Sequence, residues 1–183
     1  MTRSYQGGQR IMALMPIITA PDPRLKVLSE AVGTVDDAVR KLMDDMLESM
    51  YAAPGIGLSA IQVGVTKRVI VTDVAPDDKP REPLFLVNPR IVRFSDDMAR
   101  YNEGCLSLPE HYVEIERPEG ITVEFLDRDG KPQSLDAAGL LSRCIQHEMD
   151  HLDGILFVDH LSAIKRNMIL RKLVKARRQK ASA

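Results

Sequence analysis

The feature that most limits how this chain can fold is a pair of histidines in the stretch "RCIQHEMDHLDG". On an α-helix, residues four apart are separated by about 400°, so His147 and His151 project from nearly the same face, one turn apart. That spacing lets two imidazoles reach one metal ion. Glu148 lies about 100° round the helix from His147, beside such an ion rather than on it. The chain has only four histidines, which argues against a surface helix with two chance histidines.

Two histidines do not complete a catalytic metal site, which normally has a third protein ligand and one open position. Besides several acidic residues, the candidates are the remaining cysteines and histidines: Cys105, Cys144, His111 and His160. Cys105 lies in "NEGCLSLPE", where Gly104 permits close backbone approach and Pro109 is expected to end the segment. A thiolate there would suit a softer ion such as Fe(II) or Zn(II). Cys144 faces the same side of the helix as His147, but it reads more simply as a small buried apolar residue.

The rest of the chain alternates helical and strand patterns. Asp36 or Asp37 can cap a helix whose apolar residues recur at three and four up to Met50, and "AAPGIG" ends it. "RVIVTDVA" and "LFLVNPRIVRF" are predicted strands, and "GITVEFLDRDGKPQSLDA" is a predicted hairpin with its turn at Asp129-Gly130. A helix is expected from Ala138 to about residue 152. The predicted fold class is α+β, with antiparallel sheets around a central helix that bears the H-E-x-x-H motif, followed by a C-terminal helix.

The two ends of the chain are each expected to form a distinct segment. Residues 1–11 are polar and are expected to be a flexible leader or an added extension, followed by a single catalytic domain at residues 12–183. That domain includes a basic C-terminal helix at about residues 162–180. The apolar run from Ile11 to Ile18 is expected to be a first strand rather than a signal peptide, because Pro16 interrupts it. A cytoplasmic protein is therefore expected.

Composition excludes several partners. The net charge is -1, which gives no global attraction to DNA, and no stretch approaches the ~20 apolar residues of a membrane span. Two cysteines are too few for a disulfide framework. Neither DNA nor a membrane is expected as a partner.

Three separated segments together resemble the signature motifs of bacterial peptide deformylases. They are "GIGLSAIQ" (residues 55–62), "EGCLS" (residues 103–107) and "QHEMDH" (residues 146–151). They occur in the family's order and at its spacing, and the similarity runs from about Met12 to Leu161. Ser59 stands where that family more often has alanine. A hydroxyl in a packed turn needs a partner, so the local packing there is expected to differ, without any effect on a catalytic atom.

The resemblance implies a role for each matching residue. It makes Cys105, His147 and His151 the ligands of one divalent metal ion, Fe(II) in the cell, with Zn, Ni or Co as substitutes in purified protein. It makes Glu148 the general acid/base. Gln62 and the backbone N–H of Leu106 would donate to the developing oxyanion. The family hydrolyses the formyl group from the N-formylmethionine of nascent polypeptides and releases formate. A metal that activates water and a carboxylate that moves its proton suit that reaction.

Substrate contacts are expected beside these motifs. Ile56, Leu140 and Cys144 are candidates for an apolar pocket that takes the methionine side chain. Backbone groups of Ile56, Gly57 and Gly104 could pair with the substrate as an added strand. Glu103 and Arg117 are expected to form an ion pair behind the metal loop.

The tail carries eight Lys or Arg and no acidic residue between Leu161 and Ala183. Ile164, Met168, Ile169, Leu173 and Val174 give it an amphipathic pattern. One interpretation is a solvated helix with its apolar stripe on the domain. The other is a contact with the ribosome, from which the substrate emerges.

Two rival functions remain open from the residues alone. A zinc endopeptidase would share the H-E-x-x-H helix, but it would take its third ligand downstream, where only Asp153, Asp159 and His160 are available. A ribosome-binding module with a structural metal would need four protein ligands, and three are evident.

Overall fold

The structure, a computed structural model, describes residues 14–181, so the expected leader at residues 1–11 lies outside the described part of the chain. Five strands form one sheet in the order β1-β2-β3-β6-β7, and two more form a separate hairpin. All neighbouring strands pair antiparallel. The strands are β1 (Gly57–Ser59), β2 (Val69–Thr72), β3 (Leu84–Phe94), β4 (Met98–Cys105), β5 (Leu108–Pro118), β6 (Gly120–Leu126) and β7 (Pro132–Ala138).

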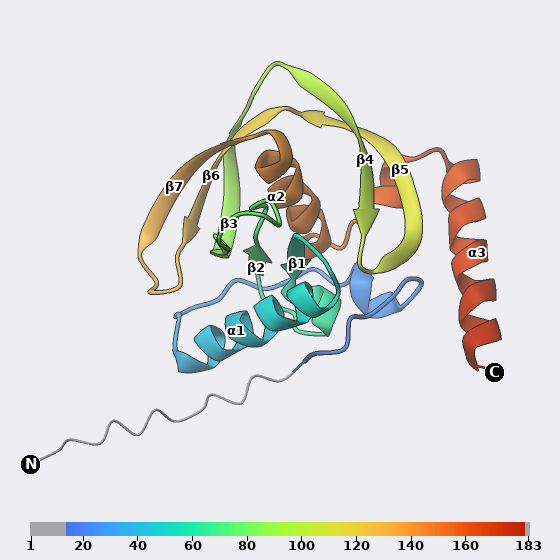
Figure 1. Ribbon diagram of the computed structural model, residues 1–183, viewed down its shortest axis with the longest axis horizontal. Coiled ribbons are helices and arrows are strands. Elements are labelled where there is room, and N and C mark those ends of the chain that lie inside the picture. Colours follow the sequence, from blue (N-terminus) through green and yellow to red (C-terminus); the bar gives the residue numbers. More distant parts are fainter. Residues whose placement is uncertain (1–13, 182–183) are drawn as a thin grey trace, which may run out of the picture.

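The α-helices are α1 (Asp37–Ala52), α2 (Gly139–Leu152) and α3 (Ala163–Ala181), and short 3₁₀ turns lie at Pro23–Lys26, Ala60–Val63 and Phe157–His160. Figure 1 shows α2 in the middle of the molecule, between the five-stranded sheet and the β4–β5 hairpin, with α3 at the far side of that hairpin. The predicted α+β arrangement, with antiparallel sheets around the motif-bearing helix and a C-terminal helix, is confirmed.

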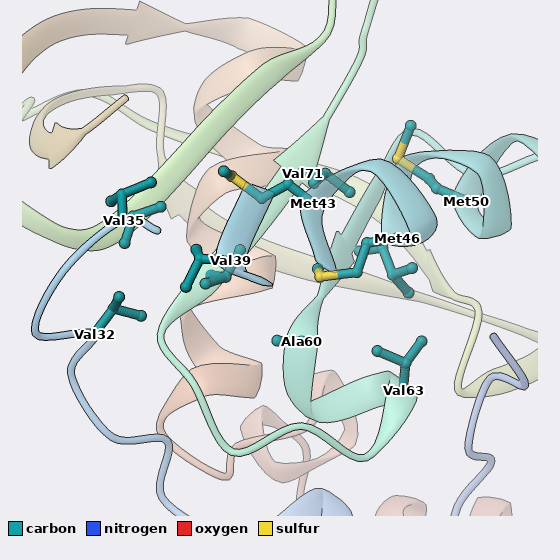
Figure 2. Close-up of a cluster of buried hydrophobic side chains, with 12 residues drawn as sticks. Val32, Val35, Val39, Met43, Met46, Met50, Ala60, Val63 and Val71 are labelled. Atoms are coloured by element: carbon teal, nitrogen blue, oxygen red, sulfur yellow. The ribbon is translucent and has the colours of Figure 1, made fainter. Parts of the chain in front are cut away.

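Helix α1 forms where its capping residue and periodicity predict. The side chain of Asp36 accepts a hydrogen bond from the backbone N–H of Val39 at 2.9 Å, which satisfies one of the free donors at the helix start. Met43, Met46 and Met50 then lie on one buried face (Figure 2). Each such side chain stabilises the fold by about 1.5–3 kcal/mol through the apolar area it buries. This face packs against β1 and β2 and fixes the segment that leads into the site.

Helix α2 buries side chains on two faces of different character. Ile145 and Leu152 pack with Ile70 and Val123 of the sheet in one apolar cluster. The other buried face is polar and consists of Ser142, Gln146, His147, Glu148 and His151. The helix begins at Gly139, whose φ of 58° is one that glycine adopts readily. The sheet therefore holds α2 by its aliphatic face, while His147 and His151 contact the hairpin through Glu103 and Cys105.

The expected first strand is wrong in the part that the structure describes. Residues 14–19 are extended but belong to no strand. The N–H of Ile18 donates to the carbonyl of Gln62 at 2.7 Å, and that of Ala20 to the carbonyl of Ser107 at 2.8 Å. These bonds go to two different segments, so no continuous ladder forms. Met15 and Ile17 pack against the hydrophobic cluster that includes Met43 and Met46 of α1. Ile18 and Ala20 belong to a second cluster, which includes Leu108 of β5, so this segment contacts both clusters.

The β4–β5 hairpin was not predicted, and it corrects one expectation. Pro109 does not end the segment, because it lies inside β5. The chain reverses tightly between Cys105 and Leu108, which are register partners, with an irregularity between Gly104 and Cys105. This reversal presents Cys105 at the tip of the hairpin, toward α2.

Helix α3 matches its expected range, but its buried stripe is narrower than the pattern predicted. Ile169 and Leu173 are buried against the cluster that includes Leu108 and Phe157. Ile164 is 84% exposed and Met168 is 51% exposed. None of the helices within residues 14–181 is both long enough and apolar enough to cross a bilayer.

Candidate active site

The structure brings together the three residues expected to bind metal. One donor atom each from Cys105, His147 and His151 lie within 4.8 Å of one another. The Cys105 sulfur is 3.1 Å from Nε2 of His151, and the two imidazole rings are nearly perpendicular, with centroids 4.9 Å apart. The helix provides both imidazoles, as its four-residue spacing predicts, and the hairpin tip provides the sulfur.

Buried carboxylate and guanidinium groups hold His147 in place. Its Nδ1 lies 3.0 Å from Oε2 of Glu103, and Glu103 accepts two bonds from Arg117, at 2.5 and 3.0 Å. Arg117 also contacts Asp150 at 3.0 Å, so the expected ion pair behind the metal loop is confirmed and extends onto α2. Burial alone would raise the pKa of Glu103, but its bonds from His147 and Arg117 lower that pKa to about 2. Glu103 therefore stays ionised, and its contact with Nδ1 orients the His147 ring.

The two histidines have opposite electrostatic surroundings, with anionic groups around His147 and cationic groups near His151. Burial lowers the pKa of His147, but the Cys105 sulfur and the carboxylates of Glu103 and Glu148 outweigh it and hold that pKa well above its usual value. Burial and the neighbouring cations hold the pKa of His151 well below its usual value, which keeps the ring neutral, as a ligand must be. Nδ1 of His151 is buried with no hydrogen-bond partner within residues 14–181. One sulfur and two imidazoles form a donor set typical of zinc or iron, with room for one further ligand.

Glu148 lies beside this group and is not one of its donors. Its carboxyl group is buried, and burial raises its pKa even though His147 and a hydrogen bond from Ser59 oppose the rise. The Ser59 hydroxyl lies 2.5 Å from Oε2 of Glu148 and 2.9 Å from its main-chain carbonyl. The partner that the Ser59 hydroxyl was expected to need is thus Glu148, the residue expected to be the acid/base. Sequence spacing gave no signal of this contact between residues 89 positions apart.

Gln62 is fixed at both ends of its amide. Its Oε1 accepts from the backbone N–H of Ser59 at 2.8 Å, while its Nε2 donates to Ser107 at 3.1 Å and lies 3.6 Å from the Cys105 sulfur. The Gln62 amide nitrogen thus lies beside the Cys105 sulfur, one of the three atoms expected to bind metal. Leu106 follows Cys105 at the hairpin tip, and its side chain packs against Gly55, where a Cβ would lie only 2.6 Å from Leu106 Cδ1.

A cavity of about 540 Å³ opens beside these residues. It is lined by most of the expected substrate-binding and catalytic residues: Ile56, Gly57, Gly104, Cys105, Leu106, Leu140, Cys144, His147 and Glu148. Gln62 and His151 are not among its lining residues. Gly57 is needed here for space, because a Cβ on it would lie 2.6 Å from both the Cys144 sulfur and Oε1 of Glu148.

The cavity also includes residues that sequence reasoning missed. The polar or aromatic ones with the largest side chains are Glu110, His111, Tyr112 and Arg143. Arg143 lies four residues before His147 on the same helix face, a spacing that could have identified it. The other three come from β5, whose pairing was not predicted, so the sequence carried no comparable signal. From the sequence, His111 was only one of the candidate metal ligands.

The other residues considered as metal ligands lie outside the group formed by Cys105, His147 and His151. Cys144 is buried, its sulfur is 3.1 Å from the Thr72 hydroxyl, and burial raises its pKa. Both cysteines are free, so they form no disulfide with each other. His160 contacts Asp150 at 2.8 Å, away from Cys105. Among the residues described, the group of potential ligands therefore has three members and not the four of a closed structural site.

Comparison with known proteins gives one consistent result. The family model described as "Polypeptide deformylase" matches residues 14–167. The peptide deformylase of Rhizobium meliloti is 52% identical over 165 residues, which cover 90% of this chain and 95% of the relative. That of Phenylobacterium zucineum is 54% identical over 164 residues, with 90% and 97% covered.

Solved structures agree with the sequence relatives. The peptide deformylase of Ehrlichia chaffeensis, in complex with actinonin, superposes with a TM-score of 0.86 at 43% identity, covering 90% of this chain and 98% of that one. A peptide deformylase from Legionella pneumophila gives a TM-score of 0.86 at 44% identity, with 93% and 99% covered.

Proposed function

The chain belongs to the polypeptide deformylase family, and we propose how its own residues divide the work of that reaction. It is a metal-dependent enzyme that removes the N-formyl group from nascent polypeptides. The proposal concerns which side chains hold the metal, move the proton and select the substrate, within one catalytic domain at residues 12–183. The observation that carries it is the convergence of one donor atom each from Cys105, His147 and His151, beside a cavity that Cys105, His147 and Glu148 line.

Cys105, His147 and His151 hold one divalent ion, with Glu103 and Arg117 orienting the ring of His147. We take the ion to be Fe(II) in the cell, with Zn, Ni or Co as substitutes, because the sulfur and two imidazoles suit these softer ions. When bound, such an ion supplies Lewis acidity, which lowers the pKa of water and polarises the formyl oxygen.

Glu148 is the general acid/base. It takes a proton from the attacking water and delivers it to the departing amine, so that formate and a free N-terminus leave the site. Its buried position and raised pKa support this role, because a carboxyl group that must both accept and give a proton works best with its pKa moved toward neutrality.

Gln62 and the backbone N–H of Leu106 stabilise the developing oxyanion. Support comes from the Gln62 amide nitrogen, which lies 3.6 Å from the Cys105 sulfur and is held there through the backbone of Ser59. A donor fixed before reaction needs no reorganisation, and one such donor contributes about 3 kcal/mol to the stability of the transition state.

Ile56, Leu140 and Cys144 form the wall that receives the methionine side chain, and the peptide backbone adds to the edge strand β1 at Gly57, opposite Gly104. Strand β1 pairs with β2 on one side and ends the sheet on the other, which supports strand addition. The carbonyl of Ile56 already accepts from the N–H of Asp73 and the hydroxyl of Thr72, so its N–H is the group left for a substrate.

The formylated substrate is made at the ribosome. We propose that α3 contacts the ribosome, in the cytoplasm. Ile164 and Met168 are exposed among basic residues, whereas Ile169, Leu170 and Leu173 pack the helix against the domain cluster. A basic helix held by one narrow stripe leaves its outer face for an acidic partner such as ribosomal RNA.

Formate release from formyl-Met and formyl-Ala peptides, measured anaerobically with metal analysis, tests this assignment. Filling the apolar wall with the longer side chain should raise kcat/KM for formyl-Met by about 10-fold or more. Equal values would mean that the wall near Ile56 and Leu140 does not bind the methionine. Cleavage of internal bonds in unformylated peptides, without formate release, would instead favour the zinc endopeptidase.

A further inference from the structure

The Ser59 hydroxyl contacts Glu148 in the centre of the site. Ser59 is the last residue of β1 and is fully buried, and Glu148 lies on α2. The hydroxyl lies 2.5 Å from Oε2 of the carboxylate and 2.9 Å from the Glu148 main-chain carbonyl. It has a single hydrogen to donate, and a carboxylate oxygen is the stronger acceptor of the two.

The two carboxylate oxygens of Glu148 have different surroundings. Oε2 faces the Ser59 hydroxyl, whereas Oε1 lies over Gly57, where a Cβ would come within 2.6 Å of it. Gly57 and Glu148 both line the cavity. The final torsion of a glutamate side chain is broad and roughly two-fold, so packing alone does not decide which oxygen points where.

We propose that Ser59 is a positioning residue, whose hydroxyl holds Oε2 of Glu148 and so keeps Oε1 as the oxygen that handles the proton in the cavity. This inference rests on the proposed role of Glu148 as acid/base. Ser59 touches no substrate, and it acts by reducing the orientations of the carboxylate to the one that the reaction needs. The backbone of Ser59 also donates to Gln62, so one residue of β1 fixes both the acid/base and the oxyanion donor.

Ser59→Ala tests the proposal with little risk to folding, since it removes one oxygen from a buried turn. We expect kcat for a formyl-Met peptide to fall about three- to tenfold, the effect of one net hydrogen bond, with KM within twofold and metal content unchanged. Unchanged kcat would overturn the proposal. A proportional change in KM, or lost metal, would also overturn it, because the hydroxyl would then support the site only structurally.

Ser49→Ala is the matched control. Ser49 is also a buried, hydrogen-bonded serine, accepting from the N–H of Met15 and donating to the carbonyl of Asp45, but it lies on α1 away from the cavity. This variant should lower the melting temperature and keep the wild-type kcat. A fall in kcat like that of Ser59→Ala would show a general response to lost buried hydroxyls and would overturn the proposal.

A stability cycle tests the contact without any activity. Unfolding is compared for Ser59→Ala, Glu148→Ala and the double variant, all metal-free. The cost of Ser59→Ala should be smaller once the Glu148 side chain is gone, and strict additivity would overturn the proposal. A wild-type protein that released no formate would refute the proposed function, whereas an active wild type with an indifferent Ser59→Ala would refute only the positioning role.

Discussion

Helices α2 and α3 are 14 and 19 residues long and differ in how many polar side chains they bury. The buried face of α2 toward the hairpin is polar, whereas α3 buries the aliphatic residues Ile169 and Leu173 and turns most of its cations outward. Burying a polar group without a partner costs about 1–3 kcal/mol, so a face like that of α2 persists only when its groups are paired.

The pairing around α2 is extensive. The Gln146 amide donates to the carbonyl of Pro118 and to the Ser142 hydroxyl, and His147 and Glu148 bond to Glu103 and Ser59. Helix α3 has weaker ties, such as the 3.7 Å contact between Arg166 and Asp159. Helix α2 can therefore bury polar side chains because other side chains pair with most of them, whereas α3 is held to the domain by a narrow apolar stripe. Changes to α2 should therefore act on chemistry, and changes to α3 on stability or partners.

The largest expected effect is loss of a metal ligand. Cys105→Ala, His147→Ala or His151→Ala should each abolish stoichiometric metal binding and formate release, because two ligands do not close the site. Metal analysis of the purified variants checks this. Cys144→Ala is the cysteine control and should keep its metal. A ligand variant that retained full metal and activity would lose its assignment.

The next effect separates chemistry from metal binding on the same helix. Glu148→Gln should fold and keep its metal but lose at least about 100-fold in kcat, as expected when a general acid/base is removed. Steady-state kinetics beside metal analysis measure it. If Glu148→Gln kept near-wild-type activity, Glu148 would not be the general acid/base. If the variant lost its metal, Glu148 would be one of the metal ligands.

Removing the buried cation behind α2 should destabilise the protein more than removing an exposed cation on the sheet surface. Arg117→Met leaves Glu103 and Asp150 without their shared cation and should destabilise the protein by about 3–5 kcal/mol in denaturant unfolding. Arg90→Met removes an exposed pair with Glu124 and should cost less than about 1 kcal/mol. Similar costs for the two variants would mean that the polar side of α2 does not depend on this pairing.

Helix α3 should respond only where it is buried. Ile169→Ala should cost about 2–4 kcal/mol of unfolding free energy, because it leaves a cavity in the cluster under β5. Ile164→Ala, at an exposed position, should change it by less than about 0.5 kcal/mol. Neither should change the kcat of folded enzyme. A loss of kcat in Ile169→Ala would show that α3 shapes the site.

The smallest effect on catalysis should follow truncation after Val174. Hydrolysis of short formyl peptides should stay within about twofold, because none of the described residues beyond Val174 lines the cavity. Binding to ribosomes should weaken and lose salt dependence, since four basic residues are removed: Lys175, Arg177, Arg178 and Lys180. Cosedimentation over a salt series measures this. If the full-length and truncated proteins sedimented equally with ribosomes, the residues after Val174 would not bind the ribosome, and α3 would only pack on the domain.

The sequence by itself determined the elements whose signals are local. The Asp36 cap, the three-and-four spacing of α1 and the Asp129-Gly130 turn predicted their elements, because helix and turn geometry depend on residues a few positions apart. The same locality placed His147 and His151 on one face of α2. The three motifs together indicated the family, which the comparisons confirm.

Only the tertiary structure decided what those elements meet. It placed Cys105 against His151 across 46 positions, Glu103 against His147 across 44 and Ser59 against Glu148 across 89. Long-range contacts follow from packing and strand pairing, which no local period encodes. For the same reason the β4–β5 hairpin went unpredicted, and residues 14–18, the described part of the apolar run, do not form a strand. A strand needs a continuous partner edge, and that edge exists only once the rest of the chain has folded.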